Sequence, residues 1–330
     1  MPKIKVGIIG LGVGLKHYEA YKHSNLSQVK AISDYDKKKF EKIKKENRNI
    51  KYFHNSKDLI NNKDIDLVSI ASYDDDHYNQ ILECIKNKKN IFVEKPICLK
   101  QSQLQRIKKL IKKKDIKIES NFVLRHTGIF KNLKKIIKKE KKTLYHIEAD
   151  YLWGRYRKLF GWRSKAKNYS LILGGAIHMI DLVCWLLEDL PIKVYTVGNK
   201  IALKNERFKK ENFILMLLEF RNKLTVKISV NSCSQSKHFH DVRIFTKNKS
   251  IYHSPLESVI FKNQSQKKLL GLYPDKENRK NQIINFLKKL NNKKNKQLYD
   301  VNLFNVMQIC FEGIKSLKLK KAIDIRYAKN

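Results

Sequence analysis

The chain of 330 residues is 42% hydrophobic, enough to bury a sizeable core, and its length predicts two domains. No apolar stretch approaches the ~20 residues of a membrane span, and the apolar run at the N-terminus is too short for a secretory signal. The formal net charge of +40 suggests an anionic partner such as nucleic acid. However, the lysines recur beside apolar residues at helical spacing, so we expect solvated helix faces and no dedicated nucleic-acid function.

Residues 1–122 alternate between short apolar strands and amphipathic helices. Strands are expected at 4–9, 28–34, 50–54, 66–72, 90–94 and 116–122. Helices are expected from about residue 15 and at 37–46, 76–87 and 102–114. Apolar strands separated by helices are typical of a parallel sheet covered on both faces. We therefore expect an α/β, doubly wound nucleotide-binding domain over 1–122.

A glycine-rich turn joins the first strand to the first helix. Glycine recurs at Gly10, Gly12 and Gly14, with Val13 inside the turn. Glycines let the backbone approach a pyrophosphate, and the helix N-terminus offers N–H groups to an anion. The alternative is a tight strand-to-helix turn without a ligand, because a glycine motif alone is a weak signal.

Asp34 ends the second predicted strand. An acid at this place can accept hydrogen bonds from an adenosine ribose, and it favours NAD over NADP because it would repel a 2′-phosphate. The lysines at 37–39 lie close enough to keep NADP open as an alternative. Asp34 could instead cap the following helix, since both Asp34 and Asp36 precede it.

Two further polar segments follow strands of this part. Ser72 ends the strand at 66–72, and His77 is expected near the nicotinamide end of a cofactor or at a helix start. Glu94-Lys95-Pro96 follows the strand that begins at 90. Open α/β sheets bind ligands at the carboxyl ends of their strands, and a lysine there can donate to a substrate oxygen. The alternative for Lys95 is a surface lysine in an ion pair.

The pattern changes after residue 122. Helices are expected at 129–139, 176–187, about 278–293 and 302–317, and strands at 145–153, 192–199, 213–220, 224–232, 241–246 and 259–262. Strands so close in sequence favour a mostly antiparallel or mixed sheet. We expect an α+β substrate-binding domain over 123–330, with the active site between the two domains.

The apolar helix at 176–187 carries His178 and Asp181, which are three apart and share a face. Their neighbours are apolar, so both side chains need polar partners or a cavity. A histidine at the start of a buried helix could act as a general base or hold a hydroxyl. The alternative is a structural histidine with satisfied hydrogen bonds.

Metal binding is not expected. His238 and His240, at i and i+2 on a strand, would share one face beside Asp241, but no third ligand follows at a suitable spacing. The five cysteines are scattered and form no C-x-x-C pair, which argues against a zinc site or a disulfide framework and fits a reducing cytoplasm.

These motifs together resemble the Gfo/Idh/MocA oxidoreductase family over nearly the whole chain. The resemblance rests on the glycine turn at 10–14, Asp34, His77, Glu94-Lys95-Pro96, Asn121 with Arg125, and Gly-Gly-Ala-Ile-His-Met-Ile-Asp at 174–181. It implies a Rossmann domain, an α/β domain with an open sheet, NAD(P), and oxidation or reduction at a sugar or cyclitol hydroxyl. It also implies that Lys95 and His178 flank the reacting carbon, and that the open sheet makes homodimers or homotetramers. The expected cofactor-binding residues are Gly10, Gly12, Val13, Gly14, Asp34, Ser72, His77, Glu94 and Lys95.

The sequence departs from the family pattern at three places. The third glycine comes one residue early, at Gly14, and Ser72-Tyr73 replaces the usual Thr-Pro. The acid that usually lies four residues before the histidine is Gly174 here. Asp181 is the nearest substitute, and we expect it to orient His178.

The expected reaction is hydride transfer between nicotinamide and a hydroxyl-bearing carbon of a sugar, cyclitol or nucleotide sugar. Lys95 polarises the reacting oxygen and His178 exchanges its proton. Aromatic rings stack on sugars and arginines bind anionic substituents, so the expected substrate residues are Arg125, Tyr151, Trp153, Arg155, Trp162 and Arg163. The alternatives are a lyase or glycosidase with transient oxidation, and a non-catalytic nucleotide-sensing protein.

Overall fold

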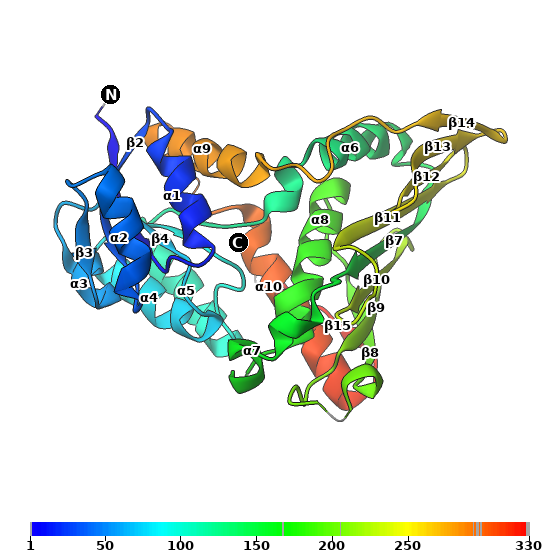
Figure 1. Ribbon diagram of the computed structural model, residues 1–330. Helices are drawn as coiled ribbons and strands as arrows, with labels where there is room; N and C mark the ends of the chain where they lie inside the picture. Colours follow the sequence, from blue (N-terminus) through cyan, green and yellow to red (C-terminus); the bar gives the residue numbers. More distant parts are fainter. Residues whose placement is uncertain are drawn as a thin grey trace. The chain divides into compact units, whose positions relative to one another are not determined.

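The computed structural model describes residues 2–166, 168–204, 206–292, 294, 297 and 299–327. The chain forms two compact units, and each is described by itself (Figure 1). Unit 1 combines Met1–His126 with Lys276–Leu303, and unit 2 combines Thr127–Asp275 with Phe304–Asn330. The sequence analysis predicts one boundary, after residue 122. In the structure the chain crosses into unit 2 and then returns to unit 1 at residues 276–303.

Unit 1 is built on a six-stranded sheet in the order β3-β2-β1-β4-β5-β6. Its strands are β1 (Ile4–Ile9), β2 (Ser27–Ser33), β3 (Lys51–Phe53), β4 (Leu67–Ile70), β5 (Asn90–Val93) and β6 (Ile118–Ser120). Its helices are α1 (Gly14–Lys22), α2 (Lys37–Glu46), α3 (Ser56–Asn61), α4 (Asp74–Lys86), α5 (Gln101–Lys114) and α9 (Asn278–Asn291). Every neighbouring pair of strands is parallel, so the predicted doubly wound sheet is confirmed.

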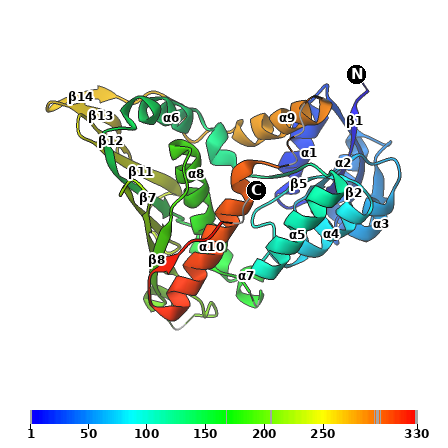
Figure 2. The ribbon, with the colours of Figure 1, turned by 180° about the vertical axis from the view of Figure 1, so that it is seen from behind.

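Helices cover both faces of the parallel sheet. On one face, Val6 and Ile8 of β1 belong to a core cluster with side chains of α1, α2 and α9. Gly7 points the other way, and a Cβ there would lie 2.5 Å from Leu59 of α3. Alternate residues of a strand face opposite sides, so α3 lies on the second face. Figure 2 shows α4 and α5 next to each other in this unit.

The late helix α9 belongs to unit 1 because of its apolar face. Ile283, Phe286 and Leu287 are buried in the same core as Phe92 of β5. Gln282 adds polar contacts, since its side-chain amide donates to the carbonyl of Ser120 at 2.7 Å. An apolar stripe at helical spacing predicts that a helix packs, but it does not identify the sheet against which it packs.

Unit 2 is built on a nine-stranded sheet in the order β14-β13-β12-β11-β7-β10-β9-β8-β15. Its strands are β7 (Leu144–Leu152), β8 (Lys193–Asn199), β9 (Phe213–Glu219), β10 (Thr225–Asn231), β11 (Phe239–Thr246), β12 (Ser250–His253), β13 (Ser258–Lys262), β14 (Ser265–Lys268) and β15 (Ile323–Asp324). Its helices are α6 (Gly128–Glu140), α7 (Trp162–Lys165), α8 (Ile177–Leu187) and most of α10 (Val301–Leu319). Only the β7–β10 pair is parallel among the strand pairs that the structure describes in this sheet, which confirms the predicted mostly antiparallel sheet.

The helices α6, α8 and α10 lie along one face of this sheet (Figure 1). Two glycines allow close approach: a Cβ at Gly175 would lie 2.8 Å from Val230 of β10, and one at Gly313 would lie 2.6 Å from Met216 of β9. A turn of π-helix at Ile172–Ala176 leads into α8. None of the helices in the described residues is long and apolar enough to cross a membrane.

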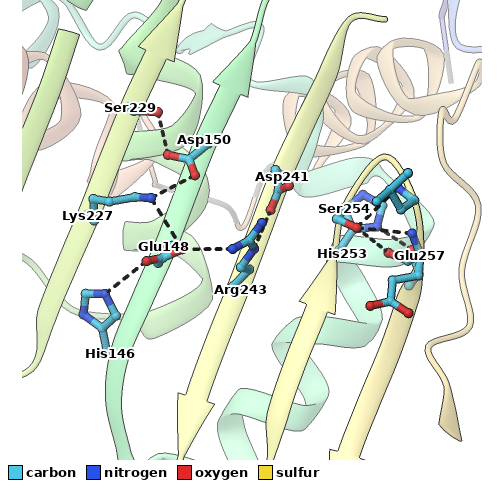
Figure 3. A network of polar contacts seen from close by, with 12 residues as sticks. His146, Glu148, Asp150, Lys227, Ser229, Asp241, Arg243, His253, Ser254 and Glu257 are labelled. Atoms are coloured by element: carbon cyan, nitrogen blue, oxygen red, sulfur yellow. Dashed lines mark hydrogen bonds and ion pairs between the residues drawn. The ribbon is translucent and has the colours of Figure 1, made fainter. Parts of the chain in front are cut away.

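The opposite face of the nine-stranded sheet carries a network of charges (Figure 3), and no helix of the described residues covers it in Figure 1. Lys227 of β10 lies 3.1 Å from Asp150 and 3.4 Å from Glu148 of β7, and Arg243 of β11 lies 3.7 Å from Glu148. Asp241 lies 3.5 Å from Arg243, and burial raises the pKa of its carboxyl to about 6. We call this side of the sheet the open face.

Apolar side chains flank the charges on the open face. Tyr145, Tyr195 and Leu217 are exposed there, on strands β7, β8 and β9. Tyr195 and Leu217 alternate along their strands with buried residues that face the helices. Tyr145 lies beside Phe245 where the register of β7 and β11 shifts. The open face is therefore a mixed surface of apolar and paired charged side chains.

Candidate active site

The glycine turn after β1 forms a cradle with open space above it. Gly10 has φ +84°, and a Cβ there would lie 2.5 Å from the carbonyl oxygen of Ala71, so only glycine fits. A Cβ at Gly12 would meet nothing within 4 Å. The helix α1 begins at Gly14, and no side chain caps its N-terminus. An uncapped helix N-terminus beside an open glycine turn fits a dinucleotide pyrophosphate.

Asp34 closes one side of this cradle. Its Oδ2 accepts a hydrogen bond from the backbone N–H of Leu11 at 2.5 Å, and its Oδ1 accepts one from Asp36 at 2.8 Å. The cap of α2 is Asp36, whose carboxylate accepts from the N–H of Lys38 at 3.1 Å. Asp34 is therefore not the N-cap, and it joins the end of β2 to the glycine turn.

His77 joins the loops that follow β4 and β5. Its ring is fully buried, with Nδ1 at 2.8 Å from the carbonyl of Pro96 and Nε2 at 3.3 Å from the carbonyl of Ser72. The hydroxyl of Ser72 donates to Gln80 at 2.7 Å. These bonds hold Ser72 and the Lys95-Pro96 segment next to each other at the carboxyl edge of the sheet.

Glu94 is held by three groups from other elements. Its Oε1 lies 3.0 Å from Nε2 of His17, 2.5 Å from the amide of Asn121 and 3.8 Å from Nε of Arg279. Burial alone would raise the pKa of Glu94, but the hydrogen bond and charge of His17, the charge of Arg279 and the Asn121 bond lower it to about 2. A fixed carboxylate thus anchors the backbone immediately before Lys95.

Lys95 lies at the edge where the strands of unit 1 end. Backbone bonds join Glu94 to Ile70 and Ala71 to Ile9, at 2.9 and 2.7 Å, so β1, β4 and β5 end side by side. The half-buried Lys95 comes two residues after the end of β5. The structure thus brings the glycine turn, Asp34, Ser72 and Glu94-Lys95 to one edge of one sheet.

Arg125 also lies in unit 1. Its guanidinium donates to Asp300 at 2.8 Å, and its carbon lies 5.4 Å from the ring centre of Phe122. Burial raises the pKa of Asp300, but the charge and hydrogen bond of Arg125 lower it overall. The side chain expected to bind substrate thus forms an ion pair that ties residue 300 to unit 1.

His178 and Asp181 lie on α8 in unit 2. His178 is half-buried, and its ring centre lies 5.8 Å from Tyr151 and 6.2 Å from His240, both edge-on. Asp181 is 1% exposed. A Cβ at Gly174 would lie 2.3 Å from the hydroxyl of Tyr169, so a phenol occupies the space of a larger side chain at that position.

Aromatic and histidine side chains surround Tyr151 at the end of β7. We call the following residues the Tyr151 cluster: Tyr151, Trp153, His178, His238, His240 and Tyr273. The Tyr151 ring stacks on His240 at 4.7 Å with 9° between the planes, and on Trp153 at 6.3 Å with 22°. Burial raises the pKa of Tyr151, which keeps the phenol neutral.

The two histidines after residue 237 are neutral at physiological pH. Burial, followed by the positive charge of Arg155, lowers the pKa of His238 to about 4. Burial lowers the pKa of His240 well below its usual value. Their ring centres are 5.0 Å apart, and the described residues contain no group of three or more His, Cys, Asp or Glu that could hold a metal.

Basic and aromatic side chains lie next to this cluster. The guanidinium of Arg163 lies 4.4 Å from the ring centre of Trp162 and 5.5 Å from that of Trp153. Arg155 is exposed and follows Trp153 after one glycine. The structure thus brings five of the six expected substrate residues into one unit, while Arg125 lies in the other.

Sequence reasoning missed several residues of these sites. His240 was considered only as a metal ligand, a role that is not expected from its spacing, and Tyr273, which bonds to it at 2.8 Å, was not identified. The hydrogen-bond partners of Glu94 were also missed, although one of them, His17, lies only three residues after Gly14. The i, i+2 spacing of His238 and His240 was the one available signal, because it predicts that both rings face the same side of a strand.

Unit 1 has a parallel sheet with a glycine cradle, and unit 2 has an open sheet with a histidine on a buried helix. Together these features define a class of two-domain oxidoreductases. This chain belongs to the Gfo/Idh/MocA family: residues 4–122 match its NAD-binding Rossmann fold, and residues 134–305 match its C-terminal alpha/beta domain. The family resemblance in the sequence and the expected nicotinamide-binding domain are thereby confirmed.

Several relatives of this chain are named inositol dehydrogenases. The chain is 30% identical over 135 residues to the myo-inositol 2-dehydrogenase of Thermotoga maritima, a match over 41% of this chain and 40% of that protein. The crystal structure of a myo-inositol 2-dehydrogenase from Lactobacillus plantarum aligns with a TM-score of 0.82 at 18% identity, over 98% of this chain and 100% of that chain. A scyllo-inositol dehydrogenase from Lactobacillus casei, solved with NAD(H) and scyllo-inositol, aligns with a TM-score of 0.80 at 16% identity, over 98% and 99%. These structures share the fold of this chain.

Proposed function

We propose that the protein is an NAD-dependent dehydrogenase that transfers a hydride between nicotinamide and a hydroxyl-bearing carbon of a sugar or cyclitol. The observation that carries the proposal is the meeting of the glycine cradle, Asp34 and Glu94-Lys95 at one edge of the sheet in unit 1. Nicotinamide supplies the hydride acceptor when the cofactor is bound. The chain must then supply the proton chemistry and the position of the substrate.

In this proposal, Lys95 and His178 carry the proton chemistry. Lys95 donates a hydrogen bond to the reacting oxygen and polarises it, and the fixed Glu94 keeps the lysine backbone in place. His178 takes or returns the hydroxyl proton. Asp181, three residues later on α8, orients this histidine and stabilises its charged form.

The proposed cofactor preference is NAD over NADP. The carboxylate of Asp34 stands beside the glycine turn, where it can accept hydrogen bonds from the two ribose hydroxyls. Lys39 lies 3.4 Å from the same carboxylate and offsets part of its charge. The preference is therefore for NAD, with NADP as the weaker cofactor.

We also propose that the open face packs against a second copy of the chain. The exposed side chains of Tyr145, Tyr195 and Leu217 offer apolar area, and the paired charges of β7, β10 and β11 offer a polar centre. A homodimer or homotetramer would cover this surface.

None of the five cysteines, all within the described residues, forms a disulfide, which supports a cytoplasmic location.

The test is a dehydrogenase screen of inositols, free sugars and nucleotide sugars with NAD and with NADP, followed at the absorbance of the reduced nicotinamide. We expect net NADH from at least one polyhydroxylated ring, and a loss of at least about a hundredfold in kcat for Lys95→Ala and for His178→Ala with NADH binding retained. Near-normal turnover of either variant would remove the role given to that residue. Substrate conversion without net NADH would instead indicate transient oxidation during elimination or glycoside hydrolysis.

A further inference from the structure

We propose that the substrate carries an anionic group on its ring, a carboxylate or a phosphate, and that Arg163 and Arg155 bind this group beside the Tyr151 cluster. The inference rests on the proposed function and specifies the substrate class of the same site. It follows from the placement of two guanidinium groups relative to the aromatic side chains of unit 2.

Arg163 is held in place by aromatic rings. Its guanidinium carbon lies 4.4, 5.5 and 6.0 Å from the ring centres of Trp162, Trp153 and Tyr169. Its one hydrogen bond in the described residues is a long one of 3.5 Å from Nη1 to the carbonyl of Lys158. A guanidinium has five N–H donors in a planar fork, so most of the donors of Arg163 are left for the two oxygens of a carboxylate or phosphate.

Arg155 follows Trp153 of the Tyr151 cluster across a sharp turn. Gly154 has φ +57°, and a Cβ there would lie 2.3 Å from the carbonyl of Ser236, so glycine is required at this position. The turn ends β7 at Trp153 and leaves Arg155 exposed immediately after it. The positive charge of Arg155 contributes to the lowered pKa values of both His238 and His240, which places it within electrostatic reach of the Tyr151 cluster.

Cationic side chains lie beside the cluster. Arg155 and Arg163 lower the pKa of Tyr151, Arg155 and Lys158 lower that of His238, and Arg155 acts on that of Tyr273. Within the part of the chain that the structure describes, neither arginine has a carboxylate within 4.0 Å. Two guanidinium groups that lack an acidic partner of their own are suited to an anionic ligand.

The position of Arg163 fits an anion on the same ring as the reacting hydroxyl. Trp153 stacks on Tyr151, and Tyr151 meets the edge of His178 at 5.8 Å. Successive contacts therefore link Arg163 to His178 through Trp153 and Tyr151 within unit 2. In the proposed complex, the substrate presents its hydroxyl to His178 and its anionic group to Arg163.

Equilibrium binding tests this inference independently of turnover. The full chain, saturated with NADH, is titrated with matched pairs of rings: glucuronate against glucose, and an inositol monophosphate against inositol. Quenching of tryptophan fluorescence reports binding, because Trp153 and Trp162 lie in the proposed site. We expect at least one anionic ring to bind about tenfold or more tightly than its neutral partner, as expected for a charged hydrogen bond. The glucuronate pair tests for a carboxylate on the ring, and the inositol monophosphate pair tests for a phosphate.

Three variants locate the anion. Arg163→Gln and Arg155→Gln should each reduce the ratio of anionic to neutral affinity by about fivefold or more. Arg155 is exposed, so its variant keeps the test sound if the Arg163 variant folds poorly. Arg221→Gln is the matched control: it removes an exposed arginine at the β9–β10 turn, at the other end of these strands from Asn231 and Leu152, and should keep the wild-type ratio.

Equal or weaker binding of both anionic rings, or a ratio unchanged by both arginine variants, overturns the inference. In that case oxidation of a neutral ring in the dehydrogenase screen would leave the proposed function standing. Selective anion binding that depends on Arg163 or Arg155, without NADH production from any substrate, would support this site and overturn the dehydrogenase proposal.

Discussion

The hydroxyl of Tyr273 lies 2.8 Å from the backbone nitrogen of His240 and 2.8 Å from its ring Nδ1. The backbone N–H can only donate, so the tyrosine oxygen accepts this bond. We assign the tyrosine proton to the bond with Nδ1, which places the ring proton of the neutral His240 on Nε2. A neutral ring agrees with the lowered pKa of the buried His240.

Replacement of Tyr273 by phenylalanine tests this tautomer. Tyr273→Phe removes one hydrogen bond from the backbone and one to the ring, and should lower the free energy of unfolding by about 1–3 kcal/mol. Nitrogen-15 shifts of His240 should report a Nε2–H tautomer in the wild type and a mixture in the variant. Tyr156→Phe, at a half-buried tyrosine in the same unit, is the control. An unchanged tautomer in Tyr273→Phe would contradict the assignment.

The Glu94 carboxylate should stabilise unit 1 in a pH-dependent way. Its pKa is lowered to about 2, so its contribution is complete above the unfolded value of about 4.5 and is lost as the pH falls toward 2. Glu94→Gln should therefore lower the free energy of unfolding by about 2–4 kcal/mol at pH 7, and by less at pH 3. Urea denaturation at the two pH values measures the difference.

An exposed pair provides the control for this result. Glu46 bonds to Lys22 at 2.6 Å at the surface of the same unit. Glu46→Gln should cost far less stability than Glu94→Gln, because solvent screens an exposed ion pair. Equal losses in the two variants would show that the buried contacts of Glu94 with His17 and Asn121 do not stabilise the unit.

Much of the fold could be predicted from local patterns. Period-two and helical spacing identified most elements within about two residues, for example 37–46 for α2 and 90–94 for β5. Short elements such as α3 and β15 were missed because six and two residues carry too little periodicity. The membership of α9 in unit 1 could not be predicted, since it depends on contacts between residues far apart in the chain, such as that of Gln282 with Ser120 across 162 positions.

The candidate site also contains residues that local motifs predict and residues that only distant contacts reveal. Lys95 and His178 were predicted because each belongs to a contiguous motif, and their roles stay predictions. Tyr273 and His240 are joined across 33 residues, and Glu94 meets His17 across 77. No local spacing encodes such pairs, because they form only when separate strands and helices pack together.

Unit 2 should lose stability as its buried histidines gain protons. Burial lowers the pKa of His253 to about 4, so the neutral ring favours folding above the unfolded value of about 6.5, and this contribution is lost as the pH falls through 4. The wild type should lose about 2–3 kcal/mol through this residue between pH 7 and pH 4. His253→Gln should flatten this part of the pH profile in chemical denaturation. His23→Gln, at an exposed ring in unit 1, should leave the wild-type slope.

The carboxylate of Asp34 should control the choice of cofactor. Asp34→Asn keeps a side-chain oxygen for the N–H of Leu11 but removes the negative charge beside the glycine turn. We expect NADH to bind about tenfold more weakly and the preference over NADPH to shrink, because a 2′-phosphate is no longer repelled. Fluorescence titration with each reduced cofactor measures both constants. An unchanged preference would assign Asp34 to the structure of the turn alone.

A charged residue on the open face should break the proposed homo-oligomer. Leu217 lies opposite Lys227 in β9 and is 48% exposed, so Leu217→Arg would place a charge in the apolar area next to the Glu148–Lys227 pair. We expect light scattering during gel filtration to give an oligomer for the wild type and a monomer for this variant. Leu256→Arg is the control, because Leu256 is 96% exposed in the β12–β13 turn, outside the open face. A wild-type mass for Leu217→Arg, or a monomeric wild type, would show that the open face is not a contact between copies of the chain.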